Sequence, residues 1–292
     1  MNTNIAAYKN GRWVQEILAL QHADGSWGHF HSLGGPISER SMTTEQALRR
    51  LQILGFTRDD PAVARALNYL HACLAGECTP PDRREKTHDW DAFEQLTLAT
   101  WVRRFRQDDP LANAVAAKWR YTIENAFSSD AFSEADYLRA YAEAFGKKAK
   151  GDRLVDFVAF YPISLLAGEI GPAVERAYFD YILSRENGIY YIYGKSLLRT
   201  PETFQSKEAS RYLAAVELLL RYPNAYVRES LKHVAAWLTE HRKEDGSFDM
   251  GQAVRDGVYF PLSDSWRNPD DRRRDCTRRI ETIIAGLTAS ST

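Results

Sequence analysis

The sequence predicts an all-α protein built from a repeated pair of helices. Apolar residues recur every three or four positions along most of the chain, which is the spacing of one helix face. Four prolines suited to the start of a helix follow one another at intervals of about 50 residues, the second interval being longer: Pro61, Pro110, Pro172 and Pro223. Strand signals are few, and residues 189–193 are the one run that favours a short hairpin.

Each of these prolines opens one predicted helix and follows another. Asp60 and Asp109 precede the first two prolines, where a carboxylate can cap the free N–H groups and proline fits the first turn. The longer interval leaves room for an extra helix over residues 133–145. The helices that precede the prolines are predicted over residues 44–56, 91–105, 154–167 and 207–222.

Glycine turns end three of the predicted helices. In each, an apolar helix is followed by a glycine and, two residues later, by an aromatic residue: Trp27, Tyr190 and Phe248. Glycine enters the left-handed backbone region without steric cost, so it suits the residue just past a helix end. We expect the following ring to cover the C-terminal end of the helix.

Composition and charge exclude several classes of protein. A chain of 292 residues can bury a large hydrophobic core. The 38 Lys and Arg residues are balanced by 39 Asp and Glu residues, so the sequence lacks the excess positive charge that is typical of nucleic-acid-binding proteins. No Gly-rich phosphate loop, signal peptide or membrane-spanning run is present, so the sequence predicts a cytoplasmic protein without a cofactor. Peripheral contact with a membrane stays open. Three cysteines are too few for a disulfide framework, and Cys73 and Cys78 are expected to be buried thiols.

Residues 13–27 resemble the repeat of squalene cyclases and protein prenyltransferases. That repeat reads as an aromatic residue, then Gln, three residues, Gly, one residue and Trp, and Gln21, Gly25 and Trp27 match it. The two later glycine turns keep the glycine and the aromatic residue. The resemblance implies a single α/α toroid domain over residues 1–292, with about five or six helical hairpins whose inner helices ring a central cavity. By its length the chain resembles one toroid of the two-domain triterpene cyclases.

The first candidate site lies at residues 88–94, which open a predicted inner helix. Related cyclases carry Asp-x-Asp-Asp at this place, and Asp89 and Asp91 match its first two acids while the third is missing. The resemblance implies that Asp91 protonates an alkene, supported by Asp89 and His88. Paired carboxylates can share a proton and separate their pKa values. The structural alternative is a helix start, with Asp91 and Glu94 as a capping box or Asp89 as the N-cap.

The second candidate site is the loop and helix start at residues 264–276. Its aspartates resemble the clusters that hold magnesium and a diphosphate, but the spacing is one residue too long, so no metal site is predicted. Arg272 and Arg273 are expected to bind a phosphate directly, with Trp266 contacting the ligand. The alternative is a charged helix start with local ion pairs.

Aromatic residues are numerous, with 7 Trp, 15 Tyr and 13 Phe. Rings on predicted inner helices, Trp90 and Phe93 among them, would stabilise a carbocation through their negative faces. Most of the rings are expected simply to fill the core. His22, His29 and His31 do not have a zinc-binding spacing and are expected to be solvated loop residues.

The leading hypothesis for function is therefore a terpenoid cyclase/prenyltransferase-like toroid that binds or cyclises an apolar isoprenoid-type ligand in an aromatic-lined cavity. The pattern leaves open whether the protein is an enzyme. A carbohydrate-active toroid is the alternative, with Asp91 and either Glu94 or Asp264 as its carboxylates and Trp90 or Trp266 stacking on a sugar. A non-catalytic scaffold is the third hypothesis.

Overall fold

The computed structural model describes residues 5–31, 42–84, 89–148, 154–222, 224–254 and 262–289. Within these ranges the regular structure is entirely helical, which confirms the predicted all-α class, and no β-strand forms. The chain divides into two compact units. Unit 1 comprises residues 1–119 and 141–155, and unit 2 comprises residues 120–140 and 156–292.

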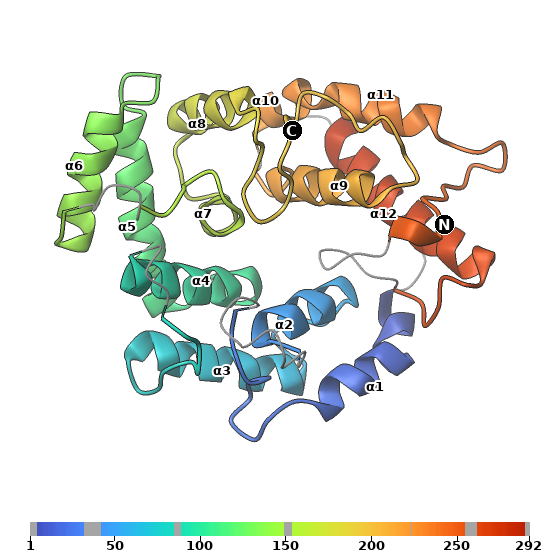
Figure 1. Ribbon diagram of the computed structural model, residues 1–292, viewed down its shortest axis with the longest axis horizontal. Helices are drawn as coiled ribbons and strands as arrows, with labels where there is room; N and C mark the ends of the chain where they lie inside the picture. Colours follow the sequence, from blue (N-terminus) through green and yellow to red (C-terminus); the bar gives the residue numbers. More distant parts are fainter. Residues whose placement is uncertain are drawn as a thin grey trace. The chain divides into compact units, whose positions relative to one another are not determined.

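Unit 1 is built on the first four helices, and α3 and α4 lie side by side in it (Figure 1). The apolar face predicted for α3, with Val63, Leu67 and Leu70, is buried. Two helices, α5 (Pro110–Ala126) and α6 (Glu134–Phe145), each pass from one unit into the other. The elements of unit 1 are η1 (Ile5–Asn10), α1 (Arg12–Ala19), α2 (Thr44–Ile53), α3 (Pro61–Ala75) and α4 (Trp90–Phe105).

Unit 2 packs α12 against α9, α10 and α11, and α7 against α9 (Figure 1). Its core carries fully buried rings, among them Tyr178, Tyr212 and Phe179. The elements that belong wholly to unit 2 are α7 (Phe160–Leu165), α8 (Pro172–Ser184), α9 (Lys207–Leu219), α10 (Ala225–Ser230), α11 (Lys232–Glu240), η3 (Gln252–Val254) and α12 (Pro269–Thr288).

The prolines mark helix starts as predicted, except that Pro223 lies outside the described residues. Asp109 caps α5, since its Oδ1 accepts the N–H groups of Leu111 at 3.1 Å and Ala112 at 3.0 Å. The side-chain cap predicted for Asp60 is wrong. Its carboxylate instead accepts the N–H of Thr57 at 2.7 Å and the ammonium of Lys9 at 2.8 Å. It makes no hydrogen bond to the free N–H groups at the start of α3.

Two predicted elements differ in the structure. The helix expected over residues 154–167 shrinks to α7, because Asp156 turns the chain by accepting the N–H of Val158 at 2.9 Å. The hairpin expected at residues 189–193 forms no strand. Its main chain makes one antiparallel bridge between Ile189 and Tyr193 and remains a tight turn.

The glycine turn after α1 ties a helix end to a neighbouring helix. Gly25 has a φ of +95°, and Gln21 Nε2 donates to the carbonyl oxygens of Gly25 at 2.9 Å and Ala62 at 2.8 Å. Trp27 is buried, and its Nε1–H donates to the carbonyl oxygen of Ile17 at 2.7 Å. The ring therefore covers the end of α1, as the sequence predicts.

The turn after α11 repeats this arrangement, with Phe248 in the place of Trp27 and Gly246, at a φ of +81°, in the place of the first glycine. The N–H of each ring residue donates to a threonine Oγ1, at 2.9 Å in the first turn and 2.8 Å in the second: Thr44 and Thr277. The third predicted copy is different, because Tyr190 is 50% exposed and covers no helix end.

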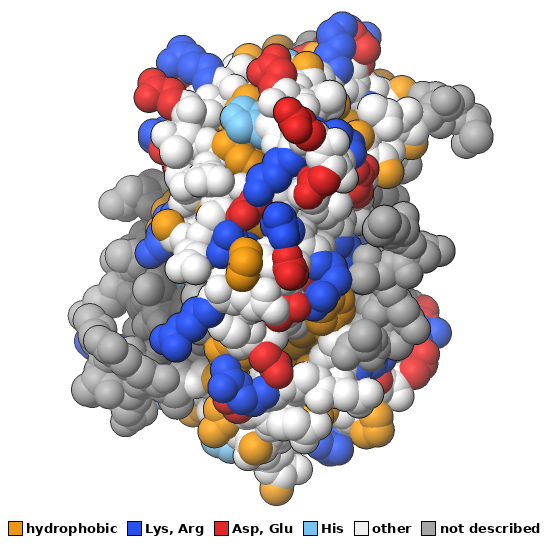
Figure 2. All heavy atoms as spheres, turned by 90° about the vertical axis from the view of Figure 1, so that its right-hand side faces the viewer, with side chains coloured by type: hydrophobic (Ala, Val, Ile, Leu, Met, Phe, Trp, Pro, Cys, Tyr) orange, Lys and Arg blue, Asp and Glu red, His pale blue; other side chains and the backbone are white. Residues whose placement is uncertain are grey.

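Acidic and basic side chains are interspersed on the face shown in Figure 2, in keeping with a net charge of −1. Among the described helices, none is long and apolar enough to cross a lipid bilayer.

Candidate functional site

Asp89 lies at the start of α4 but does not cap it through its side chain. It occupies the N-cap position, while its carboxylate accepts the Tyr141 hydroxyl at 3.0 Å and the Lys147 ammonium at 2.6 Å. Its side chain is 22% exposed. Asp89 is therefore the N-cap residue, as the structural alternative predicts, but its carboxylate bonds to Tyr141 and Lys147 and makes no capping hydrogen bond.

Asp91 is the second residue of α4 and its side chain is 64% exposed. It pairs with the Arg84 guanidinium and lies 3.8 Å from Lys147 Nζ. A capping box with Glu94 does not form here, because the helix begins before Asp91. The Asp91 carboxylate is thus engaged by Arg84 in the structure, whereas protonation of an alkene requires a carboxyl group that faces the substrate. Proton donation by Asp91 stays a prediction that requires the pair with Arg84 to open.

The other predicted residues at this helix start have different surroundings. His88 lies outside the described residues. Phe93 is buried and packs edge-on against His31, with ring centroids 5.7 Å apart. Trp90 is half-buried, and burial raises the pKa of Glu94 despite a hydrogen bond from the Trp90 side chain.

His31 corrects one expectation from the sequence. It is 5% exposed rather than solvated, and its Nε2 lies 3.9 Å from a carboxylate oxygen of Glu45. Its main chain is held by Asp82, whose carboxylate accepts the N–H groups of Phe30 at 2.8 Å and His31 at 2.9 Å. Burial raises the pKa of Asp82. Sequence reasoning missed Asp82, because no local pattern signals a contact across 51 residues.

In unit 2 the predicted ligand arginines are engaged by aspartates. Arg272 makes two hydrogen bonds to the Asp249 carboxylate, at 2.7 and 2.9 Å, and Arg273 pairs with Asp270. Burial alone would raise the pKa of Asp249, but the Arg272 guanidinium lowers it to about 2. A phosphate at Arg272 would have to displace Asp249, so phosphate binding at these arginines stays a prediction.

Trp266 is buried in the same region. Its Nε1–H donates to Asp275 at 2.7 Å, and the fully buried Asp275 also accepts the N–H and hydroxyl of Ser263, each at 2.8 Å. A carboxylate with three donors orients the loop that precedes α12. This arrangement matches the alternative of a well-bonded helix start.

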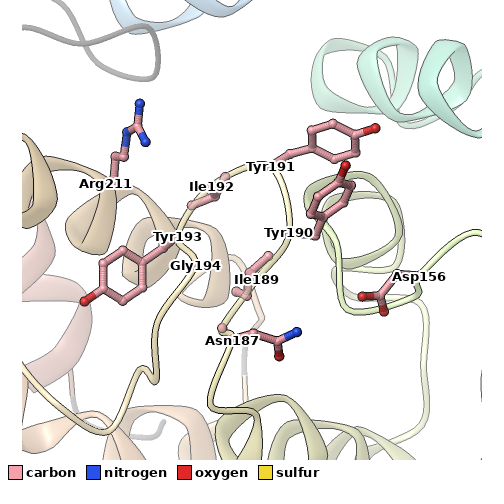
Figure 3. A pocket seen from close by; sticks show the side chains of 10 residues that line it. Asp156, Asn187, Ile189, Tyr190, Tyr191, Ile192, Tyr193, Gly194 and Arg211 are labelled. Atoms are coloured by element: carbon pink, nitrogen blue, oxygen red, sulfur yellow. The ribbon is translucent and has the colours of Figure 1, made fainter.

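A pocket of about 440 Å³ lies in unit 2 around residues 187–194, with Asp156 before α7 and Arg211 on α9 (Figure 3). The Tyr190 and Tyr191 side chains extend from the same side of the loop, and that of Tyr193 extends from the other (Figure 3). The Tyr190 and Tyr191 centroids are 4.1 Å apart. Polar and apolar side chains both contribute to the lining.

The backbone of this loop is fixed at Tyr190, whose N–H and carbonyl groups both bond to the segment that leads into α7. The Tyr190 N–H donates to the carbonyl of Val158 at 3.0 Å, and the Phe160 N–H donates to the carbonyl of Tyr190 at 3.1 Å. Tyr191 has a φ of +70°, which an L-residue rarely adopts. Gly188 precedes it where an added Cβ would overlap the carbonyl oxygen of Tyr193. Strain of this kind persists only where the surrounding structure enforces it, and it marks candidate binding loops.

The charges around the pocket are partly compensated. Arg185 donates to Asp156 at 3.2 Å and to Asn187 at 3.0 Å. Burial and the Glu208 carboxylate raise the pKa of Tyr193 to about 12, so its hydroxyl is a donor at neutral pH. The pocket therefore offers tyrosine rings, a carboxylate, an amide and a guanidinium. The aromatic run was visible in the sequence, but its folding into a pocket wall was not.

No known protein family, curated protein or solved structure matches this chain. The resemblance to squalene cyclases and prenyltransferases therefore rests on the residues of the glycine turns.

Proposed function

We propose that this chain is an α/α toroid of the squalene cyclase and prenyltransferase kind that binds an isoprenoid-type ligand. The toroid is supported by the two matching glycine turns, in which Trp27 and Phe248 are buried and each donates its N–H to a threonine hydroxyl. A turn that recurs in both sequence and hydrogen bonding is the mark of a structural repeat. A toroid uses such turns to join each outer helix to the next inner helix.

The pocket at residues 187–194 is the observation that supports ligand binding. Its volume of about 440 Å³ is within the range of small-molecule sites. Ile189, Ile192 and the tyrosine rings would contact an apolar chain, at about 0.8 kcal/mol for each CH₂ group removed from water. Arg211 lines the same pocket and would bind a diphosphate head group.

The test is binding of farnesyl and geranylgeranyl diphosphate, measured by isothermal titration and thermal shift. Tyr190→Ala should weaken binding about 5- to 30-fold, because a ring in contact with ligand contributes roughly 1–2 kcal/mol. Tyr190 is half exposed, so its removal should leave the fold intact. Tyr121→Ala is the matched control, since Tyr121 is a 42% exposed tyrosine outside the pocket lining. Equal affinity for the two variants would reject this pocket as the site.

A second candidate function is oligosaccharide binding, because Tyr190 is exposed and Asp156 and Asn187 stand beside it in the pocket. Sugars stack on exposed rings and hydrogen-bond to carboxylates and amides. Binding of oligosaccharides but not of diphosphates would establish this candidate instead. Binding of neither class would favour the scaffold hypothesis.

Catalysis is a separate part of the proposal. Cyclisation started by Asp91, with Asp89 and His88 in support, is an expectation independent of the pocket in unit 2, and it requires the Asp91–Arg84 pair to open. Product formation from an isoprenoid substrate, lost in Asp91→Asn while binding is kept, would support it.

A further inference from the structure

Two of the three cysteines are brought together at the end of α3. Cys73 lies in its last turn and Cys78 follows the C-cap residue Gly76, which has a φ of +78°. This turn reverses the chain, and the Glu77 N–H donates to the carbonyl of Ala72 at 2.9 Å. The two sulfur atoms lie 2.7 Å apart, and both thiols are free.

Both thiols are accessible as well as close. Each is half-buried rather than buried as the sequence suggested, because Glu77 and Thr79 around them are exposed loop residues. The third cysteine, Cys276, is only 1% exposed. The chain therefore carries one reachable pair and one enclosed thiol.

We propose that Cys73 and Cys78 are an oxidative modification site that closes reversibly to an intrachain disulfide by exchange with a small-molecule disulfide such as oxidised glutathione. A disulfide bond is about 2.05 Å long, so the two sulfur atoms need to approach by only about 0.7 Å through side-chain rotation. The turn at Gly76 brings Cys78 back toward the last turn of α3, where Cys73 lies.

The exchange has two balanced steps. The Cys78 thiolate attacks one sulfur of oxidised glutathione, forms a mixed disulfide and releases one glutathione thiolate. The Cys73 thiolate then attacks the Cys78 sulfur, forms the intrachain bond and releases the second glutathione. Two electrons pass from the cysteine pair to glutathione, and the two cysteine protons go to the released thiolates. Cys78 is the first nucleophile, because it lies beyond the helix end between the exposed residues Glu77 and Thr79, whereas Cys73 lies within the last turn of α3.

The bond would constrain the segment that leads from α3 to α4. This segment carries Asp82, which holds the main chain of His31, and Arg84, which pairs with Asp91. The bond itself would close residues 73–78, the first part of this segment, whether or not the proposed ligand binds.

The test uses the full chain, first reduced and then equilibrated in glutathione buffers of increasing oxidised fraction with a metal chelator present. Alkylation after unfolding, followed by mass spectrometry, should show the number of free thiols fall from three to one, with a peptide that links Cys73 to Cys78. The unfolding midpoint should rise by about 4 °C, because a short loop is closed. Reduction should reverse both changes.

The variants separate this pair from non-specific oxidation. Cys276→Ser should form the disulfide as the natural chain does. Cys73→Ser should stop at the mixed disulfide of Cys78 with glutathione, and Cys78→Ser should form no intrachain bond. The proposal is overturned if Cys73 and Cys78 both stay alkylatable in a buffer as oxidising as the endoplasmic reticulum, or if Cys276 enters the bond.

Discussion

The indole Nε1–H of Trp27 donates a 2.7 Å hydrogen bond to the main-chain carbonyl oxygen of Ile17. Ile17 lies in the last turn of α1, where its carbonyl oxygen also accepts the N–H of the C-cap residue Leu20 at 3.3 Å. Trp27 returns to that turn through the left-handed Gly25, so one side chain both adds a hydrogen bond to the Ile17 carbonyl and covers the helix end with an apolar ring.

Trp27→Ala should lower the free energy of unfolding by about 3–5 kcal/mol, because it leaves a cavity where a buried ring stood. Trp27→Phe keeps most of the ring and loses the bond to Ile17, so it should cost about 1 kcal/mol for the bond, plus a smaller packing loss. Urea unfolding followed by circular dichroism measures both. An unfolding curve for Trp27→Ala that overlays the natural chain would contradict the role of the ring.

Gly25→Ala and Gly246→Ala should differ in their effect on stability. Both glycines have positive φ, which costs an alanine about 1–2 kcal/mol. At Gly25 the new Cβ would also lie 2.5 Å from the carbonyl oxygen of Arg65, whereas at Gly246 it would meet open space. Gly25→Ala should therefore be the more destabilising by at least about 1 kcal/mol in urea titrations. Equal losses would show that α3 moves freely away from the turn.

Asp249→Asn should destabilise the protein in a pH-dependent manner. The pKa of Asp249 is about 2 in the folded chain and 3.8 ordinarily, so its charged form stabilises the fold above pH 3.8 and this contribution is lost as the pH falls toward 2. The loss should be about 1–2 kcal/mol at neutral pH, allowing for solvent screening, and should vanish near pH 2. Thermal unfolding of both proteins from pH 2 to 7 measures it. A constant difference across that range would exclude the Arg272 pair as its cause.

Glu175→Gln should stabilise the protein at neutral pH. Glu175 is buried in α8, its Oε1 has no hydrogen-bond partner among the described residues, and burial raises its pKa despite a hydrogen bond from Asn224. Above the raised pKa the folded chain must bury a charge, so stability is lost as the pH rises from the ordinary value of 4.5 through the folded one. The gain should be about 1 kcal/mol at pH 7 and absent below about pH 4. Glu186→Gln, on the surface, is the control and should show no such gain.

Asp89→Asn and Asp91→Asn should separate structure from chemistry at the start of α4. Asp89 has two side-chain partners and little exposure, so its substitution should cost about 1–2 kcal/mol of stability. Asp91 is largely exposed, and its substitution should cost less than about 0.5 kcal/mol. Chemical denaturation measures both. A large loss for Asp91→Asn would mean that its ion pairs have a structural role.

Helix positions could be predicted from the sequence because their signals are local. Proline after a capping residue, apolar spacing and a glycine past the helix end all act within a few residues, and α3, α5, α6 and α8 begin where these signals place them. The extra helix α6 was predicted from the longer proline interval alone. The match between the first and last glycine turns was also present in the sequence, as the spacing of Gly and an aromatic residue.

The candidate sites could not be predicted in the same way, because long-range partners decide them. The local sequence predicts Asp89 as a helix cap. In the structure, its carboxylate instead accepts a hydrogen bond from Tyr141, which lies 52 residues away in the chain. The local sequence predicts Arg272 as a phosphate-binding residue, but in the structure its guanidinium is hydrogen-bonded to the Asp249 carboxylate. A charged side chain pairs with whichever opposite charge the fold brings near, and the spacing of residues in the sequence does not indicate which partner that is.

The sequence by itself determined the helical class, most helix starts and the buried ring of Trp27, since backbone preferences and apolar periodicity act over a few residues. Only the tertiary structure decided that residues 187–194 form a pocket wall, that Asp82 holds the main chain of His31, and that Cys73 and Cys78 meet. Each of these depends on how a turn or a packed helix brings separate segments together, and burial and hydrogen bonding across those segments select the arrangement.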